Sequence, residues 1–248
     1  MSLYAIGDLH LHFGTELKAV HQRTDRLWKD HEERFRRACA RMIGPEDTLV
    51  LVGDHSWGRN PEECAPDFDF MIGLPGRKIL VRGNHDMFWD AKKTDVLRRR
   101  FDGRLEFLQN NYCVYADYAL VGSKGYTFEG PFYLDRRGRI VGWDEDREAQ
   151  AKRIVGRELE RLRISCEAAR SDGWKKLILF LHYPPTSILE DESCFTRLAE
   201  EYRVEQVIYA HSHGESRFHD SILGERNGIT YRLVSGDYLR WTPCKLLD

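Results

Sequence analysis

The sequence has no long apolar run, no excess of one charge and no low-complexity tract. No segment approaches the roughly 18 uninterrupted apolar residues that a membrane-spanning helix needs. Lys and Arg number 38 and Asp and Glu number 40, which leaves a formal net charge of -2. This balance gives no bulk electrostatic reason to expect nucleic acid or an anionic membrane as a partner. We therefore expect no membrane partner, and nucleic acid is disfavoured.

Closely spaced cysteine pairs are also lacking. The six cysteines are widely scattered and include no Cys-x-x-Cys pair: Cys39, Cys64, Cys113, Cys166, Cys194 and Cys244. A disulfide framework is more typical of smaller, secreted chains. No charged-then-apolar leader precedes the first apolar run. We expect reduced thiols in a cytoplasmic protein.

Internal repeats and Pro- or Ser-rich linkers are absent too, so nothing in the sequence divides the chain. The composition, 42% hydrophobic and 31% charged, is that of a globular protein. A chain of 248 residues is long enough for one large core, and one α/β domain of this size is ordinary. We predict a single domain over residues 1–248. The sequence carries no signal for an oligomeric state.

Apolar, strand-like runs alternate with helix-like stretches, a pattern that favours sheets flanked by helices. The main predicted strands cover residues 3–6, 48–52, 79–81, 177–181, 207–210 and 229–235. A further antiparallel pair is predicted from residues 107–115 and 118–121. Helices are predicted within residues 16–42, 61–70, 92–101, 144–170 and 191–202. The helix at 144–170 is the clearest, because acidic residues crowd its start and Arg170 lies near its end.

Polar residues with metal-binding side chains follow five of these apolar runs. They are Asp8, His10, Asp54, Asn84, His85, Asp86, His182, His211 and His213. Open α/β sheets bind ligands outside the carboxyl ends of their strands, so these side chains are expected to converge. Without His85 and Asp86 the set holds two Asp, one Asn and four His. This mixed oxygen and nitrogen set has enough ligands for two metal ions. His12 is a further candidate that the sequence alone does not exclude.

Two of the motifs suggest distinct roles. Asp54 follows Gly53, and a carboxylate there can bridge two cations because glycine leaves room for close approach. In Gly83-Asn84-His85-Asp86, Asn84 offers a neutral carbonyl ligand and His85 a titratable imidazole. Asp86 is placed to fix the tautomer of that imidazole. A turn alone would not require the histidine.

Taken in order, these motifs resemble the signature of the calcineurin-like metallophosphoesterases. The matching segments are Gly7-Asp8-Leu9-His10, Gly53-Asp54, Gly83-Asn84-His85-Asp86, His182 and Ala210-His211-Ser212-His213. The resemblance spans residues 8–213, and the ordered set is highly specific. One departure is Ala210, where the family usually has glycine, which costs little if the backbone there is ordinary. His55, directly after Asp54, is not required by the motif.

The resemblance implies an α/β fold: a four-layered α/β/β/α sandwich of two mixed sheets flanked by helices. It places the first metal with Asp8, His10, Asp54 and His213. It places the second with Asp54, Asn84, His182 and His211. It further implies that a hydroxide bridging the metals attacks the phosphorus of a phosphomonoester or phosphodiester. His85 lies outside both sets and is expected to protonate the leaving oxygen, with Asp86 orienting it.

The expected cofactors are two divalent transition-metal ions. A set of mixed oxygen and nitrogen ligands favours Mn, Fe or Zn over Ca. The resemblance to the family makes Mn the first choice among them. The expected substrate is a small phosphorylated molecule. A nucleotide or cyclic-nucleotide phosphodiesterase and a nuclease are alternatives, although phosphate-tracking surfaces are usually more basic. A non-catalytic metal-binding scaffold is disfavoured, because such a protein would be expected to lose ligands or His85 first.

Substrate contacts are harder to assign. Arg82 either contacts phosphate or is a solvated strand-end arginine. Residues 122–143, which include Lys124 and Tyr126, form either a plain surface excursion or a substrate-facing lid. Aromatic residues near the motifs either stack on a base or fill the core: Trp57, Phe88, Trp89, Tyr126 and Phe128.

Overall fold

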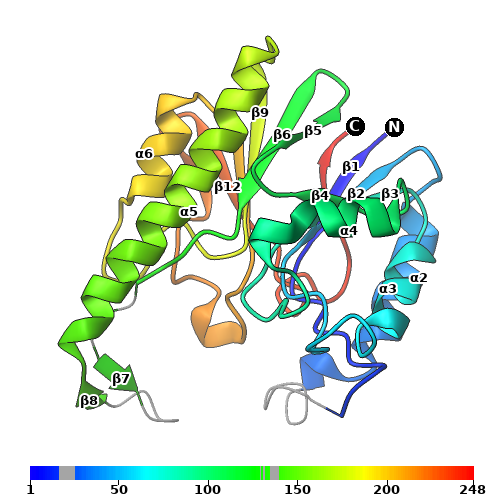
Figure 1. Ribbon diagram of the computed structural model, residues 1–248, viewed down its shortest axis with the longest axis horizontal. Helices are drawn as coiled ribbons and strands as arrows, with labels where there is room; N and C mark the ends of the chain where they lie inside the picture. The colour runs from blue at the N-terminus through cyan, green and yellow to red at the C-terminus, as the bar shows by residue number, and fades with distance from the viewer. Residues whose placement is uncertain (17–25, 129, 131, 135–139) are drawn as a thin grey trace.

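The computed structural model describes residues 1–16, 26–128, 130, 132–134 and 140–248 (Figure 1). Its first sheet has five strands in the order β13-β1-β2-β3-β4. Their bounds are Cys244–Leu247 for β13, Leu3–Ile6 for β1, Thr48–Val52 for β2, Arg77–Val81 for β3 and Glu106–Leu108 for β4. Strands β1 to β4 are parallel, and β13 pairs with β1 antiparallel. The first sheet is therefore mixed.

The second sheet has six strands in the order β11-β12-β10-β9-β6-β5. Their bounds are Gly224–Arg226 for β11, Ile229–Leu233 for β12, Gln206–Tyr209 for β10, Lys176–Leu181 for β9, Tyr118–Ser123 for β6 and Tyr112–Tyr115 for β5. The four central strands are parallel, and the two edge strands pair antiparallel. This sheet is mixed as well.

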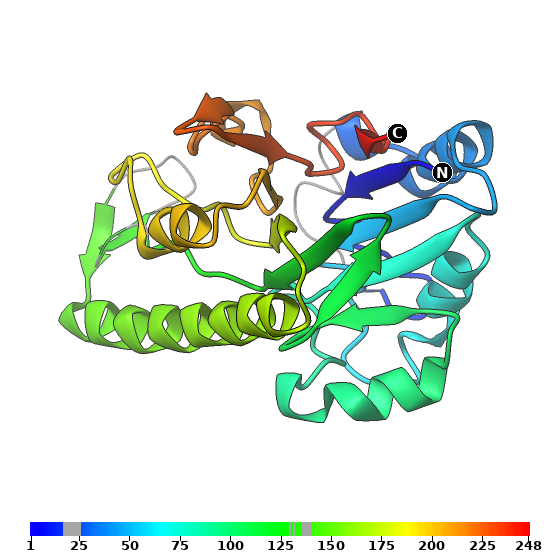
Figure 2. The same cartoon turned by 90° about the horizontal axis from the view of Figure 1, so that it is seen from above.

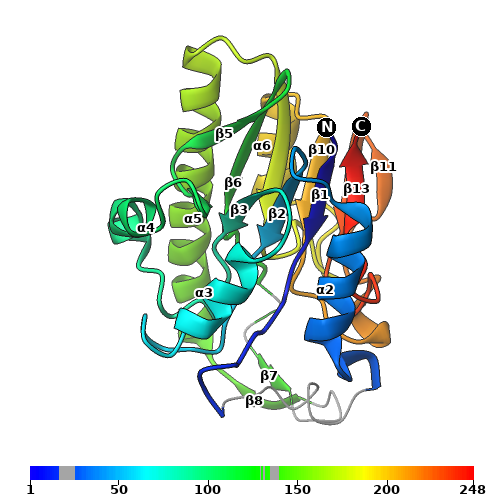
Figure 3. The same cartoon turned by 90° about the vertical axis from the view of Figure 1, so that its right-hand side faces the viewer.

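Helices cover the outer face of each sheet. The first sheet packs against α2 (His31–Met42), α3 (Ala65–Ile72) and α4 (Thr94–Phe101). The second packs against α5 (Glu145–Ser171) and α6 (Cys194–Glu201). Figures 1 and 2 show the layers in succession, and Figure 3 shows α2 and α3 across the face of the first sheet. Short 3-10 helices lie at Arg26–Trp28 (η1), Ala91–Lys93 (η2) and Glu215–Arg217 (η3).

The strand sequences explain why the two sheets stack on each other. In β2, Val50 and Val52 belong to the core between the sheets, whereas Leu49 and Leu51 belong to the core beneath the helices. Successive side chains of a strand point to opposite faces, so a run of apolar residues can be buried on both sides. The expected four-layered α/β/β/α sandwich is confirmed.

The prediction of one strand over residues 107–115 was wrong. Strand β4 joins the first sheet, whereas β5 pairs with β6 in the second. Between them, Asn110 has a positive φ of 57°, and the Asn111 side-chain oxygen accepts from the Gln109 N–H at 2.7 Å. Asparagine tolerates the left-handed backbone, and its side chain hydrogen-bonds to nearby backbone groups. Both properties favour a turn at this position. The chain crosses between the sheets there.

Long helix α5 runs past the carboxyl ends of the parallel strands (Figure 1). Asp144 caps it by accepting from the Asp146 N–H at 3.0 Å. Before it, β7 (Phe132–Leu134) and β8 (Ile140–Trp143) form an antiparallel pair that the sequence did not predict. Residues 135–139, with Arg136, Arg137 and Arg139, lie outside the described residues. Within the described part of the chain, no helix is long and apolar enough to cross a membrane.

Candidate metal centre

The candidate ligands meet at the carboxyl ends of the parallel strands. Backbone hydrogen bonds tie the loops after β1 and β2 together: the Asp8 N–H donates to Gly53 O at 3.0 Å, and the His10 N–H donates to Asp54 O at 2.8 Å. The Ala210 N–H donates to His182 O at 3.1 Å, which joins the ends of β9 and β10. The His211 N–H then donates to Asp8 Oδ2 at 2.9 Å and links the two sheets.

Four of the seven candidate ligands have left-handed backbones. The φ angles are 60° at Asp8, 44° at His10, 51° at Asp54 and 70° at His211. For residues other than glycine, such angles cost conformational free energy. These conformations persist where the surrounding structure holds them, often at functional sites. The backbone bonds between the loops supply that support here.

Glycines precede the ligands because a side chain would not fit. A Cβ atom on Gly53, whose φ is 82°, would lie 2.3 Å from His182 Nδ1. A Cβ atom on Gly83 would lie 2.1 Å from Asp54 Oδ1. Ala210 is buried and is not among the residues with a positive φ, so its methyl group needs no special backbone.

Asp8, His10 and His213 form the first group, with one ligand atom from each within 4.8 Å of the others. The Nε2 atoms of His10 and His213 are 3.3 Å apart, and Asp8 Oδ1 lies 3.6 Å from His213 Nε2. Asp8 is fully buried, and Asp8 Oδ1 has no hydrogen-bond partner among the described residues. A buried carboxylate oxygen without a partner is costly, and a cation would satisfy it. This group therefore fits a metal ion.

Asp54, His182 and His211 form the second group, again within 4.8 Å. His182 Nε2 lies 3.4 Å from Asp54 Oδ2 and 3.2 Å from His211 Nδ1. Asn84 joins them, because its Oδ1 atom is 2.8 Å from His182 Nε2. The group has the mixed oxygen and nitrogen donors that transition metals accept.

Asp54 connects the two groups. Its Oδ2 atom lies 3.7 Å from His10 Nε2 in the first group and 3.4 Å from His182 Nε2 in the second. Its Oδ1 atom accepts from the His85 N–H at 2.8 Å, which fixes the carboxylate. The two groups around this side chain fit a binuclear metal centre.

The charges of the buried side chains depend on one another. Burial raises the pKa of Asp8. Burial also opposes ionisation of Asp54, but His182 and His10 beside it hold the pKa of that carboxyl well below its usual range. Burial disfavours charge on His182, yet Asp54 and Asp8 raise its pKa to about 9. Cations bound to these carboxylates would favour their ionised forms and the neutral forms of the histidines.

Asp86 supports Asp54 rather than His85. Its buried carboxylate accepts from the Gly83 N–H at 2.6 Å, the Asp54 N–H at 3.1 Å and the His55 N–H at 2.7 Å. It also lies 2.8 Å from His55 Nδ1. The expected pairing of Asp86 with the His85 ring was wrong, because the turn at residues 83–86 directs Asp86 beneath the loop after β2. His55, which the motif does not require, is its partner.

His85 lies at the open side of the site and is only half-buried. Its ring centroid is 4.4 Å from that of Trp57 and 5.6 Å from that of His10. It belongs to neither ligand group. His12 also belongs to neither group, and its Nδ1 atom lies 3.4 Å from Glu32 Oε1.

Asp237 is a residue of the site that the sequence reasoning missed. This buried carboxylate has Oδ1 3.3 Å from His213 Nδ1 and Oδ2 accepting from the Gly214 N–H at 2.9 Å. Carboxylates behind ligating histidines fix their orientation and increase their basicity. A signal was available, because Gly236-Asp237 follows the apolar run at 229–235 as Gly53-Asp54 follows its own strand.

Two neighbouring cavities share part of their lining, and the smaller one lies beside the ligand His211. The smaller, about 200 Å³, is lined by His211, Arg147 and Arg217 among others, and the larger is about 680 Å³. Tyr126 lines both. Lys124 Nζ lies 5.7 Å from the centre of the Tyr126 ring.

The remaining candidates for substrate contact have structural neighbours. Arg82 Nε donates to Trp89 O at 2.8 Å. Trp89 and Phe88 pack in the core beneath the helices of the first sheet. Trp57 contacts His85, and Phe128 lines both cavities. Of the five aromatic residues, two thus fill core and three face the site or its cavities.

A family model described as calcineurin-like phosphoesterase matches residues 1–215. Curated protein sequences gave no significant match. Among solved structures, a protein of unknown function, AQ665 from Aquifex aeolicus, is similar with 19% identity and a TM-score of 0.44, covering 98% of this chain and 95% of that one. TT1561 of Thermus thermophilus is similar with 9% identity and a TM-score of 0.47, covering 85% and 81%. A 5'-nucleotidase from Candida albicans is similar with 15% identity and a TM-score of 0.38, covering 86% and 42%.

Proposed function

The chain belongs to the calcineurin-like phosphoesterase family, and on that premise we propose that it is a metal-dependent hydrolase of phosphoric esters with two metal ions per chain. The substrate is a phosphomonoester or phosphodiester. We further propose that residues 1–248 act as one metallophosphoesterase domain.

The observation that carries the proposal is the position of Asp54 between two groups of ligands. Asp8, His10, Asp54 and His213 would hold the first metal. Asp54, Asn84, His182 and His211 would hold the second. Imidazole nitrogens together with carboxylate and amide oxygens suit Mn, Fe or Zn, and Mn is our first choice.

Bound metal ions would lower the pKa of a water nucleophile and neutralise charge on the phosphoryl oxygens. The protein supplies the proton for the leaving oxygen. His85 suits this task because its ring is half-exposed beside the ligands and belongs to neither group. Trp57 packs against the ring and limits its orientations. Asp86 and Asp237 position Asp54 and His213 from behind.

The presence of cationic side chains near His211 is consistent with binding of a phosphorylated substrate. Arg147 and Arg217 line the small cavity that His211 also lines. Arg217 Nε donates to Asp220 Oδ2 at 2.9 Å, which orients its guanidinium. Guanidinium groups match phosphate geometry. Of the predicted substrate contacts, Tyr126 is the best placed because it lines both cavities. Lys124 and Arg82 would influence the substrate from outside the cavity lining.

A reconstitution screen tests the proposal. The metal-stripped protein is loaded separately with Mn, Fe, Zn or Mg and assayed on phosphomonoesters, phosphodiesters and cyclic nucleotides. We expect hydrolysis of at least one class with a transition metal and none without metal. A protein that binds two ions and hydrolyses none of these esters would instead be a metal-binding scaffold.

A further inference from the structure

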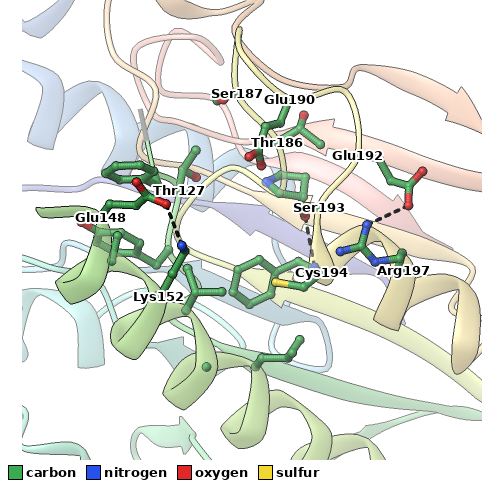
Figure 4. Close-up of a pocket in the computed structure, with 18 residues that line it drawn as sticks. Thr127, Glu148, Lys152, Thr186, Ser187, Glu190, Glu192, Ser193, Cys194 and Arg197 are labelled. Carbon is green, nitrogen blue, oxygen red and sulfur yellow. Dashed lines mark hydrogen bonds and ion pairs between the residues drawn. The ribbon is translucent and has the colours of Figure 1, made fainter. Parts of the chain in front are cut away.

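The larger cavity has a position and a lining that point to a second part of the substrate. It lies between α5, α6 and the segment after β9 (Figure 4). Figure 4 shows Glu148 and Lys152 on α5 facing Ser193, Cys194 and Arg197 at the start of α6. Its volume of about 680 Å³ is in the range of small-molecule sites.

This cavity adjoins the smaller cavity that His211 lines. Tyr126, Thr127 and Phe128 line both the larger cavity and the smaller one beside His211. Thr127 Oγ1 donates to Pro184 O at 2.5 Å, which anchors this shared wall. The Tyr183 ring centroid lies 4.2 Å from that of His211. The two cavities therefore meet at residues 126–128, so a molecule in the smaller cavity beside His211 has the larger cavity next to it.

The two cavities differ in charge. The smaller one has two arginines and no carboxylate among its described lining residues. The larger one has three carboxylates, Glu148, Glu190 and Glu192, against the two cations Lys152 and Arg197. The cations are paired within the wall: Lys152 Nζ lies 2.6 Å from Glu148 Oε1, and Arg197 Nη1 donates to Glu192 Oε1 at 2.9 Å. Counted over the lining residues, the smaller cavity is net positive and the larger is net negative, so phosphate is favoured in the smaller one.

The rest of the larger cavity is mainly apolar. Its walls include Phe128, Phe195, Ala151, Val155 and Leu159. Such surface gains free energy when an apolar group replaces water.

One residue marks the open space along α5. A Cβ atom built on Gly156, a lining residue, would meet no atom within 4 Å. Gly156 is an exposed lining residue, so a large side chain at this position would begin in open space at the cavity.

We propose that the larger cavity holds the alcohol part of the substrate, so the enzyme hydrolyses phosphoesters of bulky, apolar alcohols that carry no second phosphate. The inference rests on the proposed function. The phosphoryl group lies at the metal centre and the small cavity, and the alcohol lies against α5 and α6.

Three esters with leaving groups of matched type test the inference. Ethyl phosphate and 2-(2-naphthyl)ethyl phosphate both release a primary alcohol, and a third ester carries a non-hydrolysable phosphonate on the naphthyl ring in place of a second phosphate. If only diesters are hydrolysed, the methyl diesters of the same alcohols are used. We expect kcat/KM for the naphthylethyl ester to exceed that of the ethyl ester by about 10- to 100-fold. We expect the phosphonate to remove this advantage. Equal rates on all three, or a preference for the ester with the phosphonate, would overturn the proposal.

A filled-cavity variant gives the structural control. Gly156→Phe should abolish most of the advantage of the naphthylethyl ester while the ethyl ester is hydrolysed as before. Gln150→Phe adds the same ring to α5 at an exposed position outside the cavity lining and should change neither. Loss of the advantage in Gln150→Phe, or its retention in Gly156→Phe, would contradict the assignment.

A binding measurement separates this inference from the proposed function. Calorimetry of the metal-loaded protein with the product 2-(2-naphthyl)ethanol should show binding that Gly156→Phe weakens about 10-fold or more. If no ester is hydrolysed but the alcohol still binds in this manner, the proposed function fails and the cavity assignment stands. If esters are hydrolysed and the alcohol does not bind, the cavity assignment fails.

Discussion

The Nδ1 atom of His55 lies 2.8 Å from Asp86 Oδ2, and both side chains are fully buried. The same carboxylate accepts from the backbone N–H groups of Gly83, Asp54 and His55. The pair therefore joins the turn after β3 to the loop that carries Asp54. The ligand that connects the two metal groups is held from beneath by two residues that belong to neither group.

Asp86→Asn should weaken metal binding at both groups. The amide keeps one acceptor oxygen, but it places two N–H donors where buried N–H groups already point. We expect a loss of stability of about 1–3 kcal/mol, measured by denaturant unfolding, and reduced metal content. Activity on alkyl and nitrophenyl esters should fall equally. Asp69→Asn, at an exposed position, is the control. A selective loss on alkyl esters would show that Asp86 acts through His85 after all.

Asp54→Ala and His10→Ala should differ in how many metal ions are lost. Asp54 Oδ2 lies near histidines of both groups, whereas His10 belongs to the first alone. Elemental analysis after Mn loading should find a loss of both ions in Asp54→Ala and of mainly one in His10→Ala. Equal loss in the two variants would remove the bridging role of Asp54.

Asp237→Asn should affect the first group only. Its carboxylate lies behind His213 and contacts no residue of the second group in the described structure. Loss of such a carboxylate typically weakens metal affinity about 10- to 100-fold. Metal titrations should resolve one weakened and one unchanged site. Two sites weakened alike would mean that Asp237 supports the loop as a whole.

His85→Ala tests proton donation to the leaving oxygen. An alkoxide needs that proton and a nitrophenolate does not, so the loss should be about 10²- to 10⁴-fold on an alkyl ester and much smaller on a nitrophenyl ester. Metal content should stay near that of the wild type. His12→Ala, a histidine outside both groups, should change neither rate. Equal losses on both esters would assign His85 to the phosphoryl group instead.

The sequence predicted the ligands because each follows an apolar run, and parallel strands end at one edge of a sheet. His182 and His211, for example, follow β9 and β10 as expected. The sequence did not predict which way a side chain points after a turn, so Asp86 was paired with the wrong histidine. The left-handed backbone at Asp8 and His211 was equally hidden, because bonds between distant loops impose it.

The layered fold was predicted, but the strands at residues 107–115 were misassigned, and strands β7, β8, β11 and β13 and the cavities were not predicted. Residues 107–115 look like one strand because their apolar pattern does not reveal the turn at Asn110. The larger cavity depends on how α5, α6 and the segment after β9 are placed relative to one another, because all three supply lining residues. A helical pattern gives the length of α5 but not what lies opposite it.

The most direct test of the account is a structure of the Mn-loaded protein with anomalous scattering at the metal edge. The account predicts two peaks about 3.5–4 Å apart, with a carboxylate oxygen of Asp54 between them. His10 and His213 should bind one peak, and His182 and His211 the other. A single peak at full Mn occupancy, or two peaks without Asp54 between them, would contradict the binuclear centre.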